Sequence, residues 1–252
     1  MPPIERRTLL KLVAGSMAGG PAWATLPWAH AARQGARGDV AQASDAVLSI
    51  AFDHRLHSRI SANGKPLTPF QDSETLLLAD EASEAFTFVG EQTLALDDPR
   101  HGRGQQLIVS GRSPRGAEKQ VAVSFFDTLP GMAVLQTRYR NQGGTAVEII
   151  GWRSAGHALD DAPGGFWSYS GATHTDRRVW VQPLQDGFDQ RNTLGMDSSD
   201  YGGGTPVANI WRRDVGLAGR HVERVVRLLE MPVSKYAGGA SIAVESRVPA
   251  TL

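Results

Sequence analysis

The stretch VLQTRYRNQGGTAVEIIGW (Val134–Trp152) decides the fold class, because two runs of alternating or β-branched residues flank a pair of glycines. Alternation with a period of two is typical of a strand that buries one face. Gly143 and Gly144 provide the backbone freedom that a tight turn needs. We therefore expect the two runs to pair as one antiparallel hairpin.

The same pattern of short runs separated by Gly, Pro, Asn and Asp continues along the chain from Asp45. With 28 glycines and 14 prolines, the composition suits a domain rich in turns, and nothing suggests a βαβ repeat. We therefore predict an all-β fold, a large antiparallel β-sandwich. The expected strands are Val47–Phe52, Ala85–Val89, Gln106–Ser110, Gln120–Phe126, Met132–Arg140, Ala146–Arg153, Val179–Pro183, Pro206–Arg212 and Ala240–Ser246.

Two local assignments stay open. The inward face of the second run can be chosen in two ways, one register apart: Val147, Ile149 and Gly151, or Glu148 and Ile150. The segment 220–230 can be read as a helix, with apolar residues at helical spacing, or as an alternating strand closed by Pro232.

The composition excludes several function classes. The 26 basic and 26 acidic residues balance, so no long-range field attracts nucleic acid or an anionic membrane surface. A neutral substrate is the natural expectation, and no cofactor is implied. The chain has no cysteine, so its stability must come from a hydrophobic core, for which roughly 200–250 residues in one β domain are sufficient.

The N-terminus predicts export. Arg6 and Arg7, followed by Thr-Leu-Leu-Lys, match the twin-arginine pattern, and Ala22-Trp23-Ala24 offers small residues to a signal peptidase. We expect residues 1–24 to be a signal peptide, residues 25–44 a flexible leader, and residues 45–252 the folded domain, located in the periplasm or secreted. A persistent amphipathic helix is the alternative, but its glycines and Pro21 argue against it.

Two segments carry a resemblance to a known family: FWSYSGATHTDRRVWVQPL (Phe166–Leu184) and SSDYGGGTPVANIWRRDVGLAGRHVERVVRLLEMPV (Ser198–Val233). Together they resemble the N-terminal domain of bacterial α-galactosidases of glycoside hydrolase family 36. The resemblance implies a galactose-mutarotase-like β-supersandwich that precedes a (β/α)8 barrel. In the family the barrel supplies two catalytic aspartates, and its motifs do not occur in this chain. No catalytic residue is therefore assigned, and the isolated chain is expected to be inactive.

Aromatic side chains can stack on the C–H faces of sugars, while neighbouring polar groups bind hydroxyls. The residues suited to this role are Trp167, Tyr169, Trp180, Asp200, Tyr201 and Trp211. The resemblance implies an α-galactoside as the bound partner, a catalytic barrel in cis or in trans, and an oligomer of identical chains as a further option. The loop Gly202–Gly204 would border the substrate entrance or serve only as a flexible connection.

Acidic and histidine residues offer other chemistries. The acids Asp97, Asp98, Asp160, Asp161, Asp197, Asp200, Asp214 and Glu223 are interpreted as turn formers rather than a catalytic pair. A mutarotase-like enzyme would use His157, His174 and His221 with Glu223. His54 and His57 have a spacing that suits a metal but no third ligand nearby, so no metal site is predicted. Three functions remain: the domain of an α-galactosidase-like hydrolase, a stand-alone carbohydrate-binding module, and a mutarotase-like enzyme.

Overall fold

The computed structural model describes residues 4–14, 38–79, 84–161, 165–169, 181–191, 207–222, 229–247 and 250–251. Within these ranges all regular structure is β-strand, and every strand pairing is antiparallel. No helix in this part of the chain is long and apolar enough to cross a membrane. The predicted all-β, antiparallel class is therefore confirmed.

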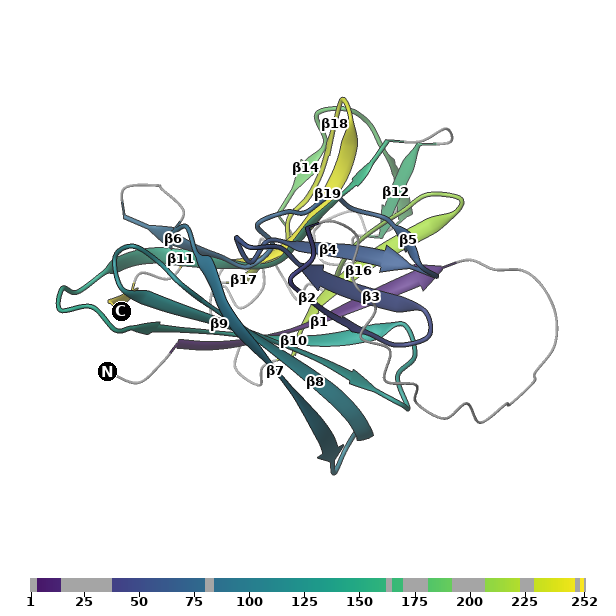
Figure 1. The fold of residues 1–252 in the computed structure, drawn as a ribbon. Helices are drawn as coiled ribbons and strands as arrows, with labels where there is room; N and C mark the ends of the chain where they lie inside the picture. Colours follow the sequence, from purple (N-terminus) through teal and green to yellow (C-terminus); the bar gives the residue numbers. More distant parts are fainter. Residues whose placement is uncertain are drawn as a thin grey trace.

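The strands form three sheets (Figure 1). The nine-stranded sheet has the order β13 (Val181–Leu184), β12 (Phe166–Tyr169), β15 (Val207–Trp211), β16 (Val215–His221), β1 (Ile4–Ala14), β10 (Met132–Asn141), β9 (Ala117–Phe126), β8 (Gly102–Arg112) and β7 (Thr87–Asp98). The seven-stranded sheet contains β14 (Asp189–Gln190), β18 (Val233–Tyr236), β19 (Gly239–Ser246), β11 (Glu148–Asp160), β20 (Ala250–Thr251), β17 (Leu229–Glu230) and β6 (Thr75–Leu78). The four-stranded sheet runs β2 (Ala41–Ser44), β3 (Leu48–Phe52), β4 (Ser58–Ala62) and β5 (Lys65–Pro66).

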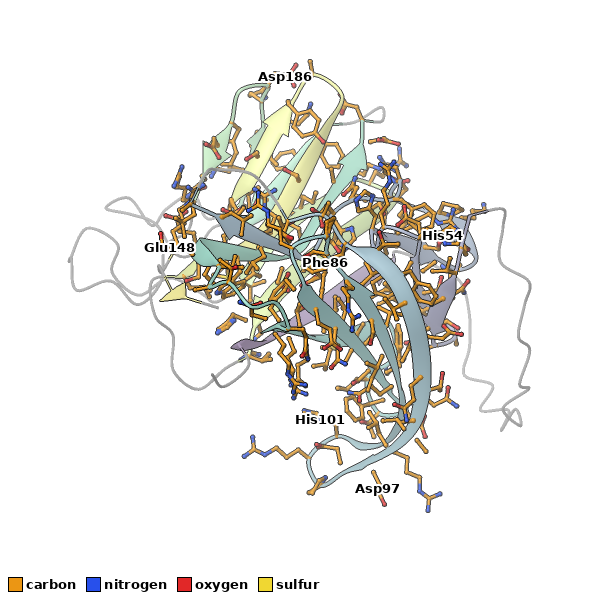
Figure 2. All side chains as sticks on the ribbon, turned by 60° about the vertical axis from the view of Figure 1, so that its left-hand side comes forward. His54, Phe86, Asp97, His101, Glu148 and Asp186 are labelled. Carbon is orange, nitrogen blue, oxygen red and sulfur yellow. The ribbon has the colours of Figure 1, made fainter. Side chains whose placement is uncertain are left out.

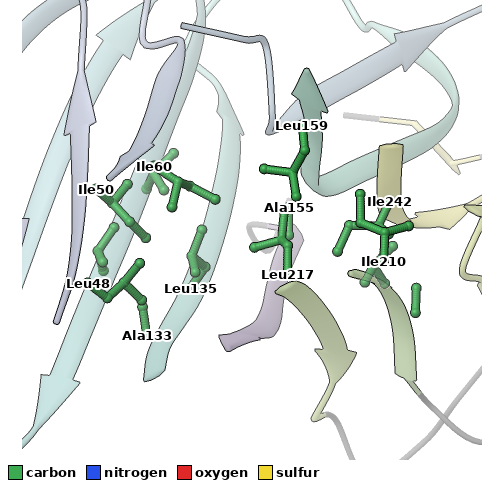
Figure 3. Packing of buried hydrophobic residues seen from close by; sticks show 14 of the residues in the cluster. Leu48, Ile50, Ile60, Ala133, Leu135, Ala155, Leu159, Ile210, Leu217 and Ile242 are labelled. Carbon is green, nitrogen blue, oxygen red and sulfur yellow. The ribbon is translucent and has the colours of Figure 1, made fainter. Parts of the chain in front are cut away.

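One hydrophobic core joins the three sheets, and Figure 3 shows part of it. Ile50 and Ile60 of the four-stranded sheet lie near Leu135 of β10, whereas Ile242 of β19 lies near Ile210 of β15. All five side chains are at most 2% exposed. Burying one such side chain contributes about 1.5–3 kcal/mol, so the core replaces the disulfides that the chain lacks.

The β7–β8 hairpin projects from the body of the molecule (Figures 1 and 2). Asp97 and His101 lie at its tip. Most residues of β7 are exposed, in contrast to the buried, regularly alternating residues of β9 and β10. The hairpin therefore contributes little to the core beyond its base, where Phe88 packs against the buried cluster.

Each of the nine predicted strands overlaps a strand of the structure. No strand was predicted at β1, at the shorter β2, β4, β5, β6, β14 and β18, or at β16, whose sequence VGLAGRH is rich in glycine. In β16 the buried residues include both glycines, so burial does not follow a simple alternation of polar and apolar letters.

The predicted hairpin across Gly143 and Gly144 is wrong. β10 pairs with β9 on one side and with β1 on the other, while β11 pairs with β19, β6 and β20 in the seven-stranded sheet. Of the two glycines, Gly143 is the one that makes a close approach as the chain leaves β10: a Cβ added to Gly116, in the turn between β8 and β9, would lie 2.9 Å from the Cα of Gly143. A Cβ added to Gly144 would meet nothing within 4 Å. Asn141 closes the crossing from β10 to β11, because its Oδ1 accepts a hydrogen bond from the Gly143 N–H at 2.8 Å.

The structure resolves the open register of β11. Ile149 is 3% exposed and Gly151 is buried, whereas Glu148 is exposed, so the first of the two faces is the inward one. In the ambiguous segment, Arg220 and His221 end β16 and Leu229 and Glu230 form β17. Residues 223–228 lie outside the described ranges.

The N-terminal boundaries differ in part from the prediction. The expected leader, 25–44, includes β2, which pairs with β3, and the Arg59 guanidinium contacts the Asp39 carboxylate at 2.8 Å. The four-stranded sheet therefore begins before Asp45, because β2 is one of its edge strands. The backbone of β1, within the expected signal peptide, lies between β10 and β16. The export signal stays a prediction.

Candidate functional site

The strand β12 sorts its four residues onto two faces. Phe166 and Ser168 are at most 1% exposed, whereas Trp167 is 40% exposed and Tyr169 is partly exposed. Because successive side chains of a strand point to opposite faces, Trp167 and Tyr169 leave the sheet on the same outward side. The buried Phe166 anchors the strand in the core.

A second aromatic residue lies directly opposite. Trp167 of β12 and Trp211 of β15 are paired positions, so both indoles leave the same face of the sheet side by side. On the other side of β12, the edge strand β13 places Pro183 opposite Trp167 and Val181 opposite Tyr169. Val181 is 47% exposed. We call Trp167, Tyr169, Trp211, Val181 and Pro183 the aromatic platform.

Asn209 holds the platform strands in register. Its Oδ1 accepts a hydrogen bond from the Tyr169 N–H at 2.9 Å, and its Nδ2 donates one to the Tyr169 carbonyl at 3.1 Å. The Ser168 hydroxyl donates to the Asn209 carbonyl at 2.7 Å. The side-chain amide thus continues the β12–β15 pairing beyond the Trp167–Trp211 pair. The sequence does not single out Asn209, because an Asn usually indicates a turn rather than a residue that links two strands.

The platform is suited to binding rather than to bond cleavage. It offers two indoles and a phenol with apolar neighbours, and none of its five residues carries a carboxylate. Exposed aromatic and apolar groups gathered on one face are a feature of interaction surfaces. Of the six predicted substrate-binding residues, the structure brings Trp167, Tyr169 and Trp211 together. Trp180, Asp200 and Tyr201 lie outside the described residues.

The described acids act in turns and ion pairs. Asp98 Oδ1 accepts hydrogen bonds from the N–H groups of Arg100 (2.8 Å) and His101 (2.9 Å), and these bonds lower the pKa of Asp98. The Arg212 guanidinium contacts Asp214 at 2.8 Å and lowers the pKa of that carboxyl. These contacts agree with the interpretation of the acids as turn formers. Asp197 and Glu223 are among the residues that the structure does not describe.

Lys235 connects two further acids. Its ammonium lies 2.6 Å from Asp186 and 3.4 Å from Asp161. Figure 2 shows Asp186 at an outer end of the molecule. Hydrogen bonding to Asp186, the largest cause, raises the pKa of Lys235. The cluster therefore ties the loop after β11 to β18, and the ammonium already neutralises part of the acid charge.

His157 and His221, two of the histidines that a mutarotase-like enzyme would use, are buried. His157 Nε2 lies 3.2 Å from the Ser58 hydroxyl, which itself lies 2.6 Å from the Ser73 hydroxyl, and all three residues are at most 1% exposed. Burial lowers the pKa of His157 to about 3. His221 stacks on Trp152 with ring centroids 6.3 Å apart. A mutarotase mechanism needs accessible, convergent groups, and these two buried histidines have different neighbours; His174 and Glu223 lie outside the described residues.

A buried polar cluster escaped the sequence analysis. Glu74 is 1% exposed; its Oε1 accepts from the Ala155 N–H at 2.7 Å and its Oε2 from the Thr137 hydroxyl at 2.7 Å. Burial, the largest cause, raises the pKa of Glu74. The buried Lys119 ammonium donates to the Glu74 carbonyl, and desolvation lowers the pKa of Lys119. The only sequence signal was an acid adjoining the apolar run Thr75–Leu78.

In the described ranges, no three His, Cys, Asp or Glu residues are grouped so that they could hold a metal ion. His57 Nδ1 instead lies 3.5 Å from Asp53. No protein-family model matches the chain, and no curated protein has significant sequence similarity to it.

Proposed function

We propose that this chain is the N-terminal domain of an exported α-galactosidase-like glycoside hydrolase. In this proposal the domain binds terminal α-galactosides on the aromatic platform, and a (β/α)8 barrel beyond these 252 residues cleaves them. The observation that carries the proposal is the Trp167–Trp211 cross-strand pair, half-open to solvent, within the segments that resemble the family. Aromatic faces beside an apolar edge strand offer the stacking surface that a sugar ring needs.

The arrangement of the sheets is compatible with the finer fold that the resemblance implies. One long sheet contributes core residues both to the four-stranded sheet, near β10, and to the seven-stranded sheet, near β15. A β-sandwich packs the facing side chains of its sheets into one core, and the shared core supports the assignment of this chain to a galactose-mutarotase-like β-supersandwich. We include this fold, and a location in the periplasm or outside the cell, in the proposal.

The test is calorimetric titration of the purified chain with raffinose, which carries a terminal α-galactosyl unit. Replacing a central aromatic of a binding surface by alanine typically weakens binding by about 2 kcal/mol, or roughly 30-fold. We expect losses of this size for Trp167→Ala and for Trp211→Ala. Tyr236→Ala is the matched control, because Tyr236 is 45% exposed but lies on β18 of the other sheet. The platform would be refuted if Trp167→Ala and Trp211→Ala bound raffinose as tightly as the Tyr236→Ala control.

A stand-alone carbohydrate-binding module is the second candidate, because the same platform would serve it. Hydrolysis of p-nitrophenyl α-D-galactopyranoside separates the readings. We expect the chain alone to bind without turnover. If a barrel-containing form of the protein hydrolyses the substrate and Trp167→Ala raises its KM, the hydrolase reading is supported. If the barrel form is unaffected by Trp167→Ala while the isolated chain still binds, the module reading replaces it. Turnover by the chain alone would overturn both.

A further inference from the structure

A cleft of about 400 Å³ opens on the seven-stranded sheet, and residues of β11 and β19 and the segment 232–234 line it. Figure 1 shows where these strands lie in the fold. Its volume lies at the lower end of the range for small-molecule pockets and far above the ~30 Å³ share of one water molecule. Polar side chains from separate parts of the chain converge on it: Gln71, Asp72, Arg153, Ser241 and Glu245. None of these residues belongs to the aromatic platform.

A β-bulge in β11 shapes the wall of the cleft. The register of β11 against β19 shifts between Ser154 and His157, and Ala155 has a φ of 50°, in the left-handed region that a non-glycine residue rarely adopts. Two buried hydrogen bonds hold this conformation: the Ala155 N–H donates to Glu74 Oε1 at 2.7 Å, and the Gly156 N–H donates to the Ser73 carbonyl at 3.0 Å. Such strain persists only where the surroundings impose it, and it is concentrated at functional sites.

The bulge also brings Arg153 into position. A Cβ on Gly156 would lie 2.8 Å from the Cδ of Arg153, so the arginine stem passes directly over the glycine. The Nε of Arg153 contacts Glu245 Oε1 at 2.6 Å. The Glu245 side chain is 6% exposed, whereas that of Arg153 is 44% exposed. Glu245 thus fixes the guanidinium through Nε, and its other N–H donors have no partner among the described residues.

The charges of the cleft cancel in pairs. Arg153 neutralises Glu245, and Asp72 Oδ1 lies 3.6 Å from the ammonium of Lys119, a buried residue that is not part of the lining. The Asp72 side chain remains 34% exposed, so its carboxylate can still accept hydrogen bonds from a ligand. A site with fixed donors and acceptors but no net charge suits a neutral ligand rich in hydroxyl groups, and it disfavours anions and cations alike.

We propose that this cleft is a second carbohydrate site that binds one neutral hexose unit, with Asp72 and Arg153 bonding its hydroxyls. The proposal does not depend on the function proposed for the aromatic platform. The described residues that line the cleft include no Phe, Tyr or Trp, so hydrogen bonds should dominate, and we expect weak affinity, in the millimolar range.

The experiment is an NMR titration of the 15N-labelled chain with D-galactose, D-glucose and D-mannose. At least one hexose is expected to shift the amide signals of Gly156, Ala158 and Ala243, which line the cleft. Asp72→Asn keeps the shape but removes the charged acceptor, and Ala243→Leu fills the cleft. Each is expected to weaken binding about 10-fold or more.

Trp167→Ala is the control, because it alters only the platform and should leave these shifts unchanged. If the amide shifts of the cleft are unchanged in Trp167→Ala, the cleft binds independently of the platform, and this holds even if the platform binds no sugar. The inference is overturned if none of the three hexoses shifts the cleft amides, if the shifts survive both cleft variants in correctly folded protein, or if they disappear in Trp167→Ala.

Discussion

The buried His157 makes the folded protein sensitive to mild acid. Burial holds its pKa at about 3, against an ordinary value of 6.5. Between these values the unfolded chain binds a proton that the folded chain does not. Stability contributed by His157 is therefore complete above pH 6.5 and is lost progressively as the pH falls toward 3.

The size of the effect follows from the same two values. Each pH unit below 6.5 removes about 1.4 kcal/mol, so lowering the pH from 7 to 5 should cost about 2 kcal/mol through this residue. The neighbours of His157 Nε2 are hydroxyls, since Ser58 lies 3.2 Å away and bonds to Ser73. No nearby carboxylate among these contacts offsets the cost of burying the charge.

The assay is urea unfolding, followed by circular dichroism at pH 7 and pH 5, of the protein and of His157→Gln. Glutamine does not titrate and can still reach Ser58. Glu74 acts in the opposite direction. Its pKa is raised in the folded protein, so its contribution to the free energy of unfolding is present at low pH and is lost as the pH rises through the folded-state pKa. Glu74 is present in both proteins, so the difference between them isolates His157. If the variant loses as much stability between pH 7 and pH 5 as the parent, the reasoning is refuted.

Two further predictions concern packing and buried hydrogen bonds, and both are checked by the midpoint of urea unfolding. Gly104→Ala should destabilise the protein by about 3 kcal/mol or more, because the added Cβ would lie 2.1 Å from a backbone carbonyl oxygen of β9. Gly90→Ala is the control and should be nearly neutral, because its added Cβ would meet nothing within 4 Å. Similar unfolding midpoints for the two variants would contradict this. Thr137→Val should cost about 1–3 kcal/mol, because the buried Glu74 carboxyl loses the Thr137 hydroxyl and keeps only its bonds to Ser154 and the Ala155 N–H. The exposed Thr93→Val should change little. An unchanged midpoint for Thr137→Val would show that this hydrogen bond is not stabilising.

Part of the candidate site could be predicted from the amino-acid sequence. Trp167 and Tyr169 are two residues apart in a strand, so their shared face follows from the period of the chain. Their partner, Trp211, lies on another strand, and its position opposite Trp167 depends on the register of β12 against β15. Asn209 contributes to that register through its amide, a role that no local pattern indicates.

The error at Gly143 and Gly144 has the same origin. Two alternating runs beside a glycine pair indicate two strands joined by a reversal or a crossing of the chain. They do not indicate with which other strands each of the two pairs. β10 is bordered by β9 and β1, and β11 by β19 and β6. A glycine pair serves a tight turn and a close crossing equally well, because both need backbone without side chains.

The sequence by itself determined that the chain is built of antiparallel strands, where most of the longer strands lie, and which residues of a strand share a face. Periodicity and turn chemistry are local properties, so they can be read without neighbours. Only the tertiary structure decided the order of strands, the crossing between sheets, the buried Glu74 and His157, and the cleft of Asp72, Arg153 and Glu245. Those features join residues up to 173 positions apart (245 − 72), and only the folded chain brings such distant residues together.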